Sequence, residues 1–447
     1  MSAPSLQDAI DRAGSPMQLL WQPDASPWDV PVVAPEYTTW QHEQESWRST
    51  AALSDLSFHM FDTVFEGKDA TQLLRDVSAN NFDRFAIGQA KQFVPVAYDG
   101  NIITDGILLR EAENRYTLTG VPAAQNWVKF HAETGGYDVR FSTDPDSSVR
   151  TEGDPKLFRF QLQGPRALEI VARAFGGPLP ETKFFHSLLV ELEGRPIRAL
   201  RHGMAGQAGY EFIGDFSDYD AVKDALLRAG ASSGLAQVGG MAYFTNGVES
   251  GWIPTPTPAI YTDPRLADYR QWLSAFSFEG KKPLGGSFYS DDITDYYLSP
   301  WELGYGRSIS LGHDFIGREA LAGARDLVQR RKVTLEFDAA DVAAVFGDEP
   351  GYVRTYDRHR IQTRDEALVG MTFWTATIAP VDRVLALALV DEDTAVPGTE
   401  LEVVWGEHPG HGTAPDADLG LPRIRATVQV SPYNEYARTA YRANVAV

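Results

Sequence analysis

Two glycine-containing segments of this sequence place charged side chains where the backbone could meet a ligand. The first runs Arg201-His-Gly-Met-Ala-Gly-Gln-Ala-Gly-Tyr-Glu211 and predicts a strand, a glycine-rich turn and a second strand. Glycines let the backbone come close to a flat molecule, and Glu211 stands beside this turn. The second segment, Asp314-Phe-Ile-Gly-Arg-Glu-Ala-Leu321, predicts a helix that Asp314 caps.

Composition narrows the class of protein. The chain has 447 residues, which is too long for one hydrophobic core and predicts two or three domains. Its formal net charge of -21 argues against binding to nucleic acid or to an anionic membrane surface, since both would repel it. The chain contains no cysteine, which excludes disulfides, thiolate catalysis and cysteine-ligated zinc.

Neither a targeting segment nor a metal site is predicted. The residues after Met1 lack the basic and apolar regions of a secretory signal, and no apolar run is long enough to span a membrane, so the expected compartment is the cytoplasm. No group of histidines and carboxylates has metal-ligand spacing, because His408 and His411 lie in a loop rich in glycine and proline. The sequence also has no P-loop and no Gly-x-Gly-x-x-Gly dinucleotide motif.

The order of predicted elements indicates an α+β protein with a β-rich C-terminal part. Strands and helices alternate through residues 1–325 in two similar rounds, with an approximate division near residue 150. Residues 250–313 form a long segment with little regular pattern, and such segments in compact domains are usually functional or form an interface. From Arg331 onwards, strand patterns separated by turns predict a β-barrel or sandwich, which we assign to residues 326–447.

Six short strings, which overlap the two segments above, carry a family resemblance. They are Pro31-Val-Val-Ala-Pro-Glu-Tyr37, Lys91-Gln-Phe-Val-Pro-Val96, Arg201-His-Gly-Met-Ala-Gly206, Glu249-Ser-Gly-Trp-Ile-Pro254, Pro258-Ala-Ile-Tyr-Thr262 and His313-Asp-Phe-Ile-Gly-Arg318. The chain resembles the folate-binding aminomethyltransferase (glycine cleavage T-protein) family, and most of all its branch of tetrahydrofolate-dependent aryl O-demethylases. The resemblance covers most of the chain. It implies a T-protein-like α+β fold in which two ferredoxin-like modules enclose a folate site and a β-barrel follows.

The resemblance implies tetrahydrofolate as the cofactor and four residues that bind it. Glu211 falls where the family binds the amino-pyrimidine edge of the pterin, and one carboxylate can accept two N–H bonds from that ring. Taken alone, this glutamate would more often be a surface carboxylate in a hairpin, but the flanking glycines and the resemblance favour the pterin contact. Arg201 opens the same string. Trp252 is similar to an aromatic residue that packs on the pterin, although core packing would explain a tryptophan equally well. Gln163 matches a cofactor contact or, alternatively, is a polar group at the end of a strand.

The resemblance also implies three catalytic residues. Tyr243 aligns with a tyrosine at the methyl-transfer site, where a phenol can hold or protonate the ether oxygen as it leaves. His59 matches a histidine that contacts the oxygen substituents of the substrate. Asp105 matches the region where the family places an aspartate near the reactive nitrogen of the folate. Taken alone, Tyr243 would more often be a core residue and His59 a structural or surface residue. A turn carboxylate between strands would explain Asp105 about equally well.

Two substrate-binding positions depart from the aryl O-demethylase pattern. The branch usually has His-His where this chain has Phe58-His59, and it has an arginine that holds the substrate carboxylate where this chain has Val121. A pocket lined by Phe58 and Val121 would leave a buried carboxylate unpaired. The two departures therefore predict a neutral methoxyarene, or one whose charge is differently placed.

These inferences together predict a methyltransferase of one-carbon metabolism. The expected enzyme is an O-demethylase that moves a methyl group from a methoxyarene to N5 of tetrahydrofolate and leaves a phenol. It would serve the catabolism of lignin-derived aromatics and act on this small-molecule partner as a monomer or homodimer. One alternative is a T-protein-like demethylase of a sulfonium or an N-methyl amine. Another is a non-catalytic folate-binding regulator with the same fold.

Overall fold

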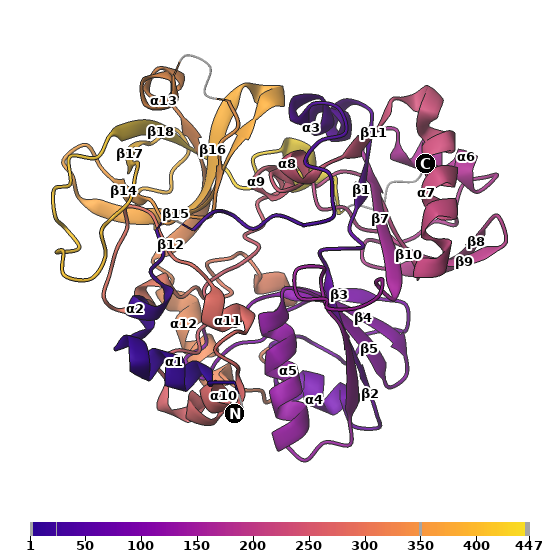
Figure 1. The fold of residues 1–447 in the computed structure, drawn as a ribbon, viewed down its shortest axis with the longest axis horizontal. Coiled ribbons are helices and arrows are strands. Elements are labelled where there is room, and N and C mark those ends of the chain that lie inside the picture. Colours follow the sequence, from indigo (N-terminus) through magenta and orange to yellow (C-terminus); the bar gives the residue numbers. More distant parts are fainter. Residues whose placement is uncertain (1–2, 24, 348–350, 443–447) are drawn as a thin grey trace.

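Three β-sheets organise the chain, which we describe from a computed structural model that covers residues 3–23, 25–347 and 351–442. Two of the sheets are flanked by helices and lie on one side of the molecule (Figure 1). A strand-rich barrel, drawn in orange and yellow, lies on the other side. Short helices and irregular segments fill the space between these three units.

The first α+β module is built on a five-stranded sheet with the order β3-β4-β5-β2-β6. All neighbouring strands in it are antiparallel. Its two helices contact each other on the apolar side, where Leu73 and Trp127 are fully buried. Its elements are β2 (Phe61–Glu66), α4 (Ala70–Asp76), β3 (Ala90–Phe93), β4 (Gly106–Ala112), β5 (Arg115–Gly120), α5 (Pro122–Thr134) and β6 (Arg140–Asp144).

The second module is built on a six-stranded sheet with the order β11-β1-β7-β10-β9-β8. Its two helices cover the outer face of the sheet (Figure 1). In α6 the buried residues Ala167, Ile170 and Val171 follow helical spacing, which turns one apolar stripe towards the sheet. The elements are β1 (Ala51–Asp55), β7 (Leu157–Gln163), α6 (Ala167–Ala174), β8 (Ser187–Leu192), β9 (Arg195–Leu200), β10 (Gly209–Asp215), α7 (Tyr219–Gly230) and β11 (Leu235–Val238).

The two modules share one connectivity, which confirms the predicted pair of related α+β modules. Each runs strand, helix, three strands, helix, strand, and in each the first strand pairs with the fourth. The second module differs because β1 inserts between β7 and β11. Since β1 precedes residue 150 and pairs with strands that follow it, the sheets do not separate cleanly there. The domain boundaries near residues 150 and 325 remain predictions.

The C-terminal strands form a closed barrel, as predicted. Six strands follow the order β15-β14-β17-β18-β12-β16, and β16 pairs back with β15 to close the ring. A short strand, β13 (Arg354–Thr355), extends the sheet beside β15. The barrel strands are β12 (Arg330–Phe337), β14 (Arg360–Gln362), β15 (Leu368–Ile378), β16 (Arg383–Asp391), β17 (Glu400–Val404) and β18 (Arg423–Gln429), with α13 (Ala339–Phe346) after β12.

Short helices connect these units. Residues 250–313 contain only short helices and turns, yet they bury Ile260, Tyr269 and Tyr296 in the largest apolar core. The indigo segment between α2 and α3 runs past the barrel towards the second module (Figure 1). The connecting helices are α1 (Leu6–Ala13), α2 (Pro16–Leu20), α3 (Trp40–Ser49), α8 (Gly240–Tyr243), α9 (Asn246–Ser250), α10 (Ala267–Trp272), α11 (Phe278–Lys281), α12 (Arg318–Ala324) and α14 (Glu435–Thr439).

The start of α12 differs from the prediction. Its N-cap residue is Gly317 rather than Asp314, and no side chain caps the helix. Gly317 has a φ of 81°, and a Cβ atom at this position would lie 2.1 Å from the carbonyl oxygen of Ala97. Because only glycine fits this conformation and this close approach, packing against Ala97 moves the helix start beyond Asp314.

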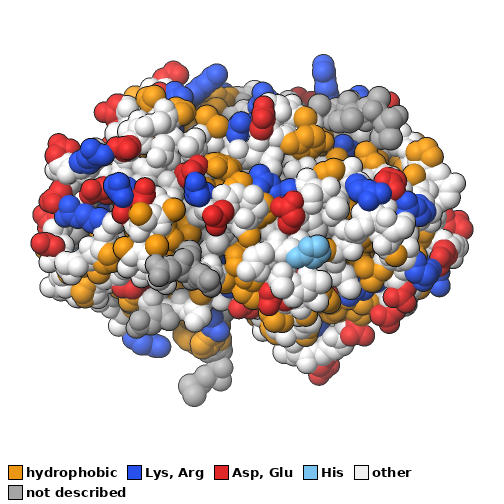
Figure 2. Space-filling view, turned by 90° about the horizontal axis from the view of Figure 1, so that it is seen from above, with side chains coloured by type: hydrophobic (Ala, Val, Ile, Leu, Met, Phe, Trp, Pro, Cys, Tyr) orange, Lys and Arg blue, Asp and Glu red, His pale blue; other side chains and the backbone are white. Residues whose placement is uncertain are grey.

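The surface is mixed in character. On the face seen in Figure 2, acidic and basic side chains are interspersed among apolar ones. Exposed apolar side chains such as Trp28, Ile87 and Leu189 occur, as they do on most soluble folds. Within the described ranges, no helix combines the length and the apolar character needed to cross a bilayer.

Candidate functional site

Strand β7 carries a row of polar side chains on one face. Arg159, Gln161 and Gln163 alternate with apolar residues, and the two-residue period of a strand puts all three on one side of the sheet. On the neighbouring strand β10, Glu211 lies directly opposite Gln161. All four side chains are buried. Buried polar groups need partners, so this face must be satisfied by the rest of the protein or by a ligand.

Arg159 connects this polar face to the first module. Its Nη1 donates to Glu211, and its Nη2 donates to Asp62 of β2 at 3.1 Å and to Thr119 of β5 at 3.3 Å. The side chain is only 6% exposed, so both ion pairs are shielded from water. Burial lowers the pKa of Arg159, but the carboxylates of Asp62 and Glu211 outweigh it and raise the pKa above its ordinary value. One guanidinium therefore joins the two modules.

The glutamines of β7 hold the glycine-rich loop between β9 and β10. Oε1 of Gln161 accepts from the backbone N–H of Met204 at 2.9 Å, and Oε1 of Gln163 accepts from that of Ala205 at 3.0 Å. Arg201 donates to the carbonyl of Gly209 at 3.2 Å and closes the base of the loop. Nε2 of Gln163 is buried without a hydrogen-bond partner. A ligand acceptor at this point would remove the cost of that unsatisfied donor.

His59 and Tyr243 form a hydrogen-bonded pair next to this loop. Nε2 of His59, which follows β1, lies 2.8 Å from the hydroxyl of Tyr243 at the end of α8. The same hydroxyl lies 3.1 Å from the sulfur of Met204. Burial, followed by the charge of Arg159, lowers the pKa of His59 to about 3. Burial raises the pKa of Tyr243 well above 10, so both groups are neutral at physiological pH.

In either tautomer of the imidazole, the His59–Tyr243 pair keeps one proton that is not donated to a strong acceptor. When Nε2 of His59 accepts from Tyr243, Nδ1 carries the ring proton, and Nδ1 is buried without a partner. When Nε2 carries the proton, the hydroxyl of Tyr243 has only the sulfur of Met204, a weak acceptor. The pair can therefore donate a hydrogen bond to an oxygen-bearing ligand.

Aromatic side chains surround the pair. The ring of Phe244 lies 5.2 Å from that of Tyr243 and 6.1 Å from that of His59, between centroids. Phe58 packs against the same apolar cluster and is half-buried. A surface of this kind suits the packing of an aromatic ring.

Asp105 lies in a second cluster, directly before β4. Its Oδ2 accepts from Nε2 of Gln92 at 2.8 Å, from the indole N–H of Trp252 at 2.9 Å and from the hydroxyl of Tyr305 at 3.2 Å. Its Oδ1 is buried without a partner. Burial raises the pKa of Asp105 in spite of these three donors. Lys332 reaches the same region from β12, and burial lowers its pKa to about 8.

The structure thus gathers the predicted residues into two clusters. The first cluster contains the glycine-rich loop and the three predicted residues that bind or flank it, Glu211, Gln163 and Arg201. Met204 of that loop contacts the His59–Tyr243 pair. Trp252 joins the other cluster, where its indole orients Asp105. Val121 directly precedes α5, next to the last residue of β5. The ligand contacts expected of all these residues remain predictions.

Several contributors were not predicted from the sequence. Arg159 and Gln161 did carry a signal, since a polar row in an apolar strand indicates a buried polar face. Met204 lies inside one of the six strings, but its contact with Tyr243 depends on the folded loop. Gln92 and Tyr305 have no local signal, because their contacts with Asp105 join distant segments.

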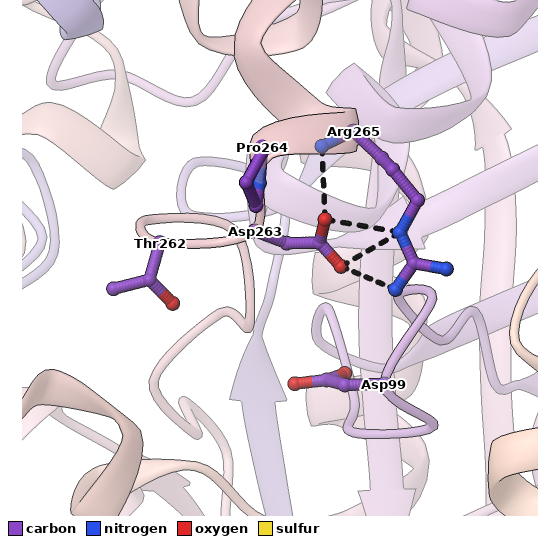
Figure 3. A pocket seen from close by; sticks show the side chains of 5 residues that line it. All are labelled: Asp99, Thr262, Asp263, Pro264 and Arg265. Carbon is purple, nitrogen blue, oxygen red and sulfur yellow. Dashed lines mark hydrogen bonds and ion pairs between the residues drawn. The ribbon is translucent and has the colours of Figure 1, made fainter.

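A surface hollow of about 560 Å³ lies apart from both clusters (Figure 3). Within it Asp263 and Arg265 form an ion pair at 2.6 Å. None of the predicted site residues lines it, and Arg265 is exposed. We assign it no function. The lining residues are Asp99, Thr262, Asp263, Pro264 and Arg265.

The histidines of the barrel region have protein partners. His408 bonds through both ring nitrogens to the backbone of its own loop. A separate group, Asp357, His359 and Glu407, has donor atoms within 4.8 Å of one another. Within that group Asp357 accepts from the hydroxyl of Thr355, and Glu407 accepts from a backbone N–H at 2.5 Å. The expectation that the protein uses no metal remains a prediction.

The fold is that of an aminomethyltransferase. The solved structure of glycine cleavage system aminomethyltransferase T from Bartonella henselae matches it with a TM-score of 0.61. The match covers 96% of this chain and 97% of that chain at 19% sequence identity. At this identity the likeness defines the fold class alone.

The sequence defines the family. Residues 22–256 match the GCVT N-terminal domain. Syringate O-demethylase from Sphingobium sp. is 39% identical over 98% of both chains. Sesamin methylene transferase from Sinomonas sp. is 29% identical over 89% of both chains. The chain belongs to the GCVT family, which confirms the resemblance drawn from the six strings.

Replacing Asp105 with asparagine tests whether this buried carboxyl costs stability. An asparagine keeps one oxygen for the three donors and removes the charge. The folded-state pKa of Asp105 is raised, so ionisation costs stability as the pH rises above about 4. We therefore expect Asp105→Asn to be at least as heat-stable as the wild type at about pH 7, with the Tm difference shrinking as the pH falls towards about 4.

Thermal unfolding followed by circular dichroism measures this difference. The exposed Asp326→Asn is the matched control and should leave Tm unchanged at both pH values. A clearly lower Tm for Asp105→Asn at neutral pH would mean that the ionised carboxylate stabilises the fold.

Proposed function

We propose that the protein is a tetrahydrofolate-dependent O-demethylase. It transfers the methyl group of a methoxyarene to N5 of tetrahydrofolate and gives a phenol and 5-methyltetrahydrofolate. The observation that carries the proposal is the neutral His59–Tyr243 pair, which lies among aromatic side chains beside a buried polar face. The 39% identity to syringate O-demethylase supports the same assignment.

Residues of both clusters suit a folate. Nε2 of Gln163 and Oδ1 of Asp105 are buried and have no hydrogen-bond partner. A bound ligand could supply the missing partners. Glu211 gives one oxygen to Arg159 and keeps acceptor capacity for the N–H groups of a pterin. Arg201 contributes by holding the loop. When bound, tetrahydrofolate supplies the nitrogen nucleophile that accepts the methyl group.

Tyr243 and His59 act on the leaving oxygen. Demethylation breaks the bond between the methyl carbon and the ether oxygen, and an aryl oxide is a poor leaving group. A donor aimed at that oxygen stabilises the negative charge as it develops and delivers a proton to the phenolate. The pair carries this proton already, because burial keeps Tyr243 a phenol.

Asp105 completes the proton balance. The overall reaction also moves one proton, because the phenol that is formed carries a proton that the folate nitrogen would give up. Oδ1 of Asp105 is the free acceptor that would hold or take the proton from nitrogen. The three donors to Oδ2, among them Trp252, fix the orientation of the carboxyl.

The rival functions fit the site less well. A sulfonium or N-methyl amine is cationic and favours an unpaired carboxylate, whereas Asp62 and Glu211, on the polar face beside the His59–Tyr243 pair, are already paired with Arg159. Among the described residues the carboxyl group of Asp105 has no ion pair, but it belongs to the other cluster. A non-catalytic folate-binding regulator would have no use for the unsatisfied donor of the His59–Tyr243 pair, which costs stability. Cytoplasmic location, the monomeric or dimeric state and the part played in aromatic catabolism remain predictions from the sequence.

Glu211→Gln should weaken the binding of tetrahydrofolate about tenfold or more, because a charge-assisted contact becomes a neutral one. Isothermal titration calorimetry measures the Kd. Asp62→Asn is the control, since it removes the other ion pair of Arg159 and leaves Glu211 in place. An unchanged Kd would exclude Glu211 from the cofactor site, and an equal loss in both variants would assign the effect to Arg159.

Tyr243→Phe should lower kcat about a hundredfold and change KM little, because its hydroxyl acts on charge that exists only in the transition state. Initial rates of 5-methyltetrahydrofolate formation provide the measurement. Tyr137→Phe is the control, since that hydroxyl donates to Asp76 at 2.7 Å on the first module. A kcat that stays within a few-fold of wild type would make Tyr243 a packing residue.

A further inference from the structure

Arg354 of the barrel region reaches the aromatic cluster around Tyr243. It lies on β13, and its guanidinium carbon is 5.1 Å from the ring centroid of Phe244. The same ring contacts those of Tyr243 and His59. The side chain of Arg354 is only 6% exposed. A buried cation thus packs on the ring that also borders the proposed methyl-transfer pair.

The hydrogen-bonding capacity of Arg354 is only partly used. Its Nη2 donates to Oδ1 of Asp29 at 2.8 Å, while its Nε is buried without a partner. Nε and Nη2 form one edge of the guanidinium, and such an edge can bind both oxygens of a carboxylate. Asp29 makes only one of these two bonds. Arg354 therefore binds the carboxylate of Asp29 through one hydrogen bond, although its guanidinium edge could donate two.

Asp29 is a partner that can be exchanged. Its side chain is 71% exposed and belongs to the irregular segment between α2 and α3. This segment covers the cluster, since the ring of Trp28 lies 5.8 Å from that of Phe244 and Val30 is buried in the same cluster. Because an exposed carboxylate loses little on returning to water, another carboxylate could replace Asp29 at small cost.

Three other buried arginines are less suited to bind the anionic group of a substrate. Arg159 is bound to two carboxylates. Arg201 donates to a backbone carbonyl. Arg358 also has an Nε without a partner, but it packs on the ring of Phe373 and donates to the backbone carbonyl of that residue. A second anion beside Arg159 would meet those carboxylates and be repelled. Of these four cations, only Arg354 combines an Nε without a partner with a position on the ring of Phe244.

We infer that Arg354 binds the carboxylate of the substrate, which is then a methoxybenzoate. The inference rests on the proposed O-demethylase function. Arg354 and His59 both contact Phe244, so a benzene ring beside Phe244 could turn its carboxylate to Arg354 and its methoxy group to the His59–Tyr243 pair. Arg354 would thereby take the role that the arginine expected at position 121 has in related enzymes. Val121 then does not require a neutral substrate.

The test compares a hydroxymethoxybenzoate with its primary amide, which has a similar shape and no charge. For each compound, kcat and KM with tetrahydrofolate are measured, together with a calorimetric Kd in its absence. We expect the wild type to prefer the acid. Arg354→Gln should raise KM and Kd for the acid at least about tenfold, leave kcat within a few-fold and leave the amide unaffected.

Three further variants make the result specific. Arg354→Lys keeps the charge without the two-point edge and should retain part of the preference. Asp29→Asn removes the competing carboxylate and should tighten binding of the acid. The exposed Arg364→Gln, in which the lost partner is Glu400, is the matched control and should change neither Kd.

Two outcomes would overturn the inference. One is an equal loss for acid and amide in Arg354→Gln, which would make Arg354 a structural residue. The other is a wild type that prefers the amide, as the sequence around Val121 predicts. A wild type that neither binds nor demethylates either compound would instead refute the proposed function itself.

Discussion

The ion pairs of Arg159 are the interaction on which the arrangement of the site depends. One guanidinium, removed from water, holds Glu211 of the second module and Asp62 of the first. Breaking a buried ion pair by removing one partner costs about 3–5 kcal/mol, because the remaining charge stays buried. The two sheets must therefore meet at this point. The glutamines beside Arg159 then fix the glycine-rich loop, and with it Met204 next to Tyr243.

The same network sets the electrostatics around the proposed reaction centre. Two carboxylates share one guanidinium, so the polar face favours the N–H groups of a heterocycle and disfavours a further anion. Burial and the charge of Arg159 keep His59 neutral, which suits a donor to a leaving oxygen. An anionic substituent has to be bound elsewhere, and Arg354 offers a cation on the neighbouring ring of Phe244.

Each part of the fold contributes a different group to the two clusters of the candidate site. The two α+β modules supply the polar face, α8 and the turn after β1 supply the His59–Tyr243 pair, and β13 supplies Arg354. The irregular residues 250–313 supply Trp252 and Tyr305, which orient Asp105. A segment without periodic pattern thus gains its order from side-chain contacts with other segments rather than from regular secondary structure.

The sequence by itself determined the family, the two α+β rounds, the barrel strands and the position of Glu211 beside a glycine-rich turn. The family came from the resemblance of six short strings to a known family. The other features rest on short-range physics, because strand alternation, turn glycines and helix periods depend on residues a few positions apart. The sequence misplaced the start of α12, since the need for Gly317 comes from the distant Ala97. Only the tertiary structure decided that Trp252 orients Asp105 and that Arg354 packs on Phe244. Such contacts join residues far apart in the chain, and their pairing follows from how the packed units meet rather than from any local pattern.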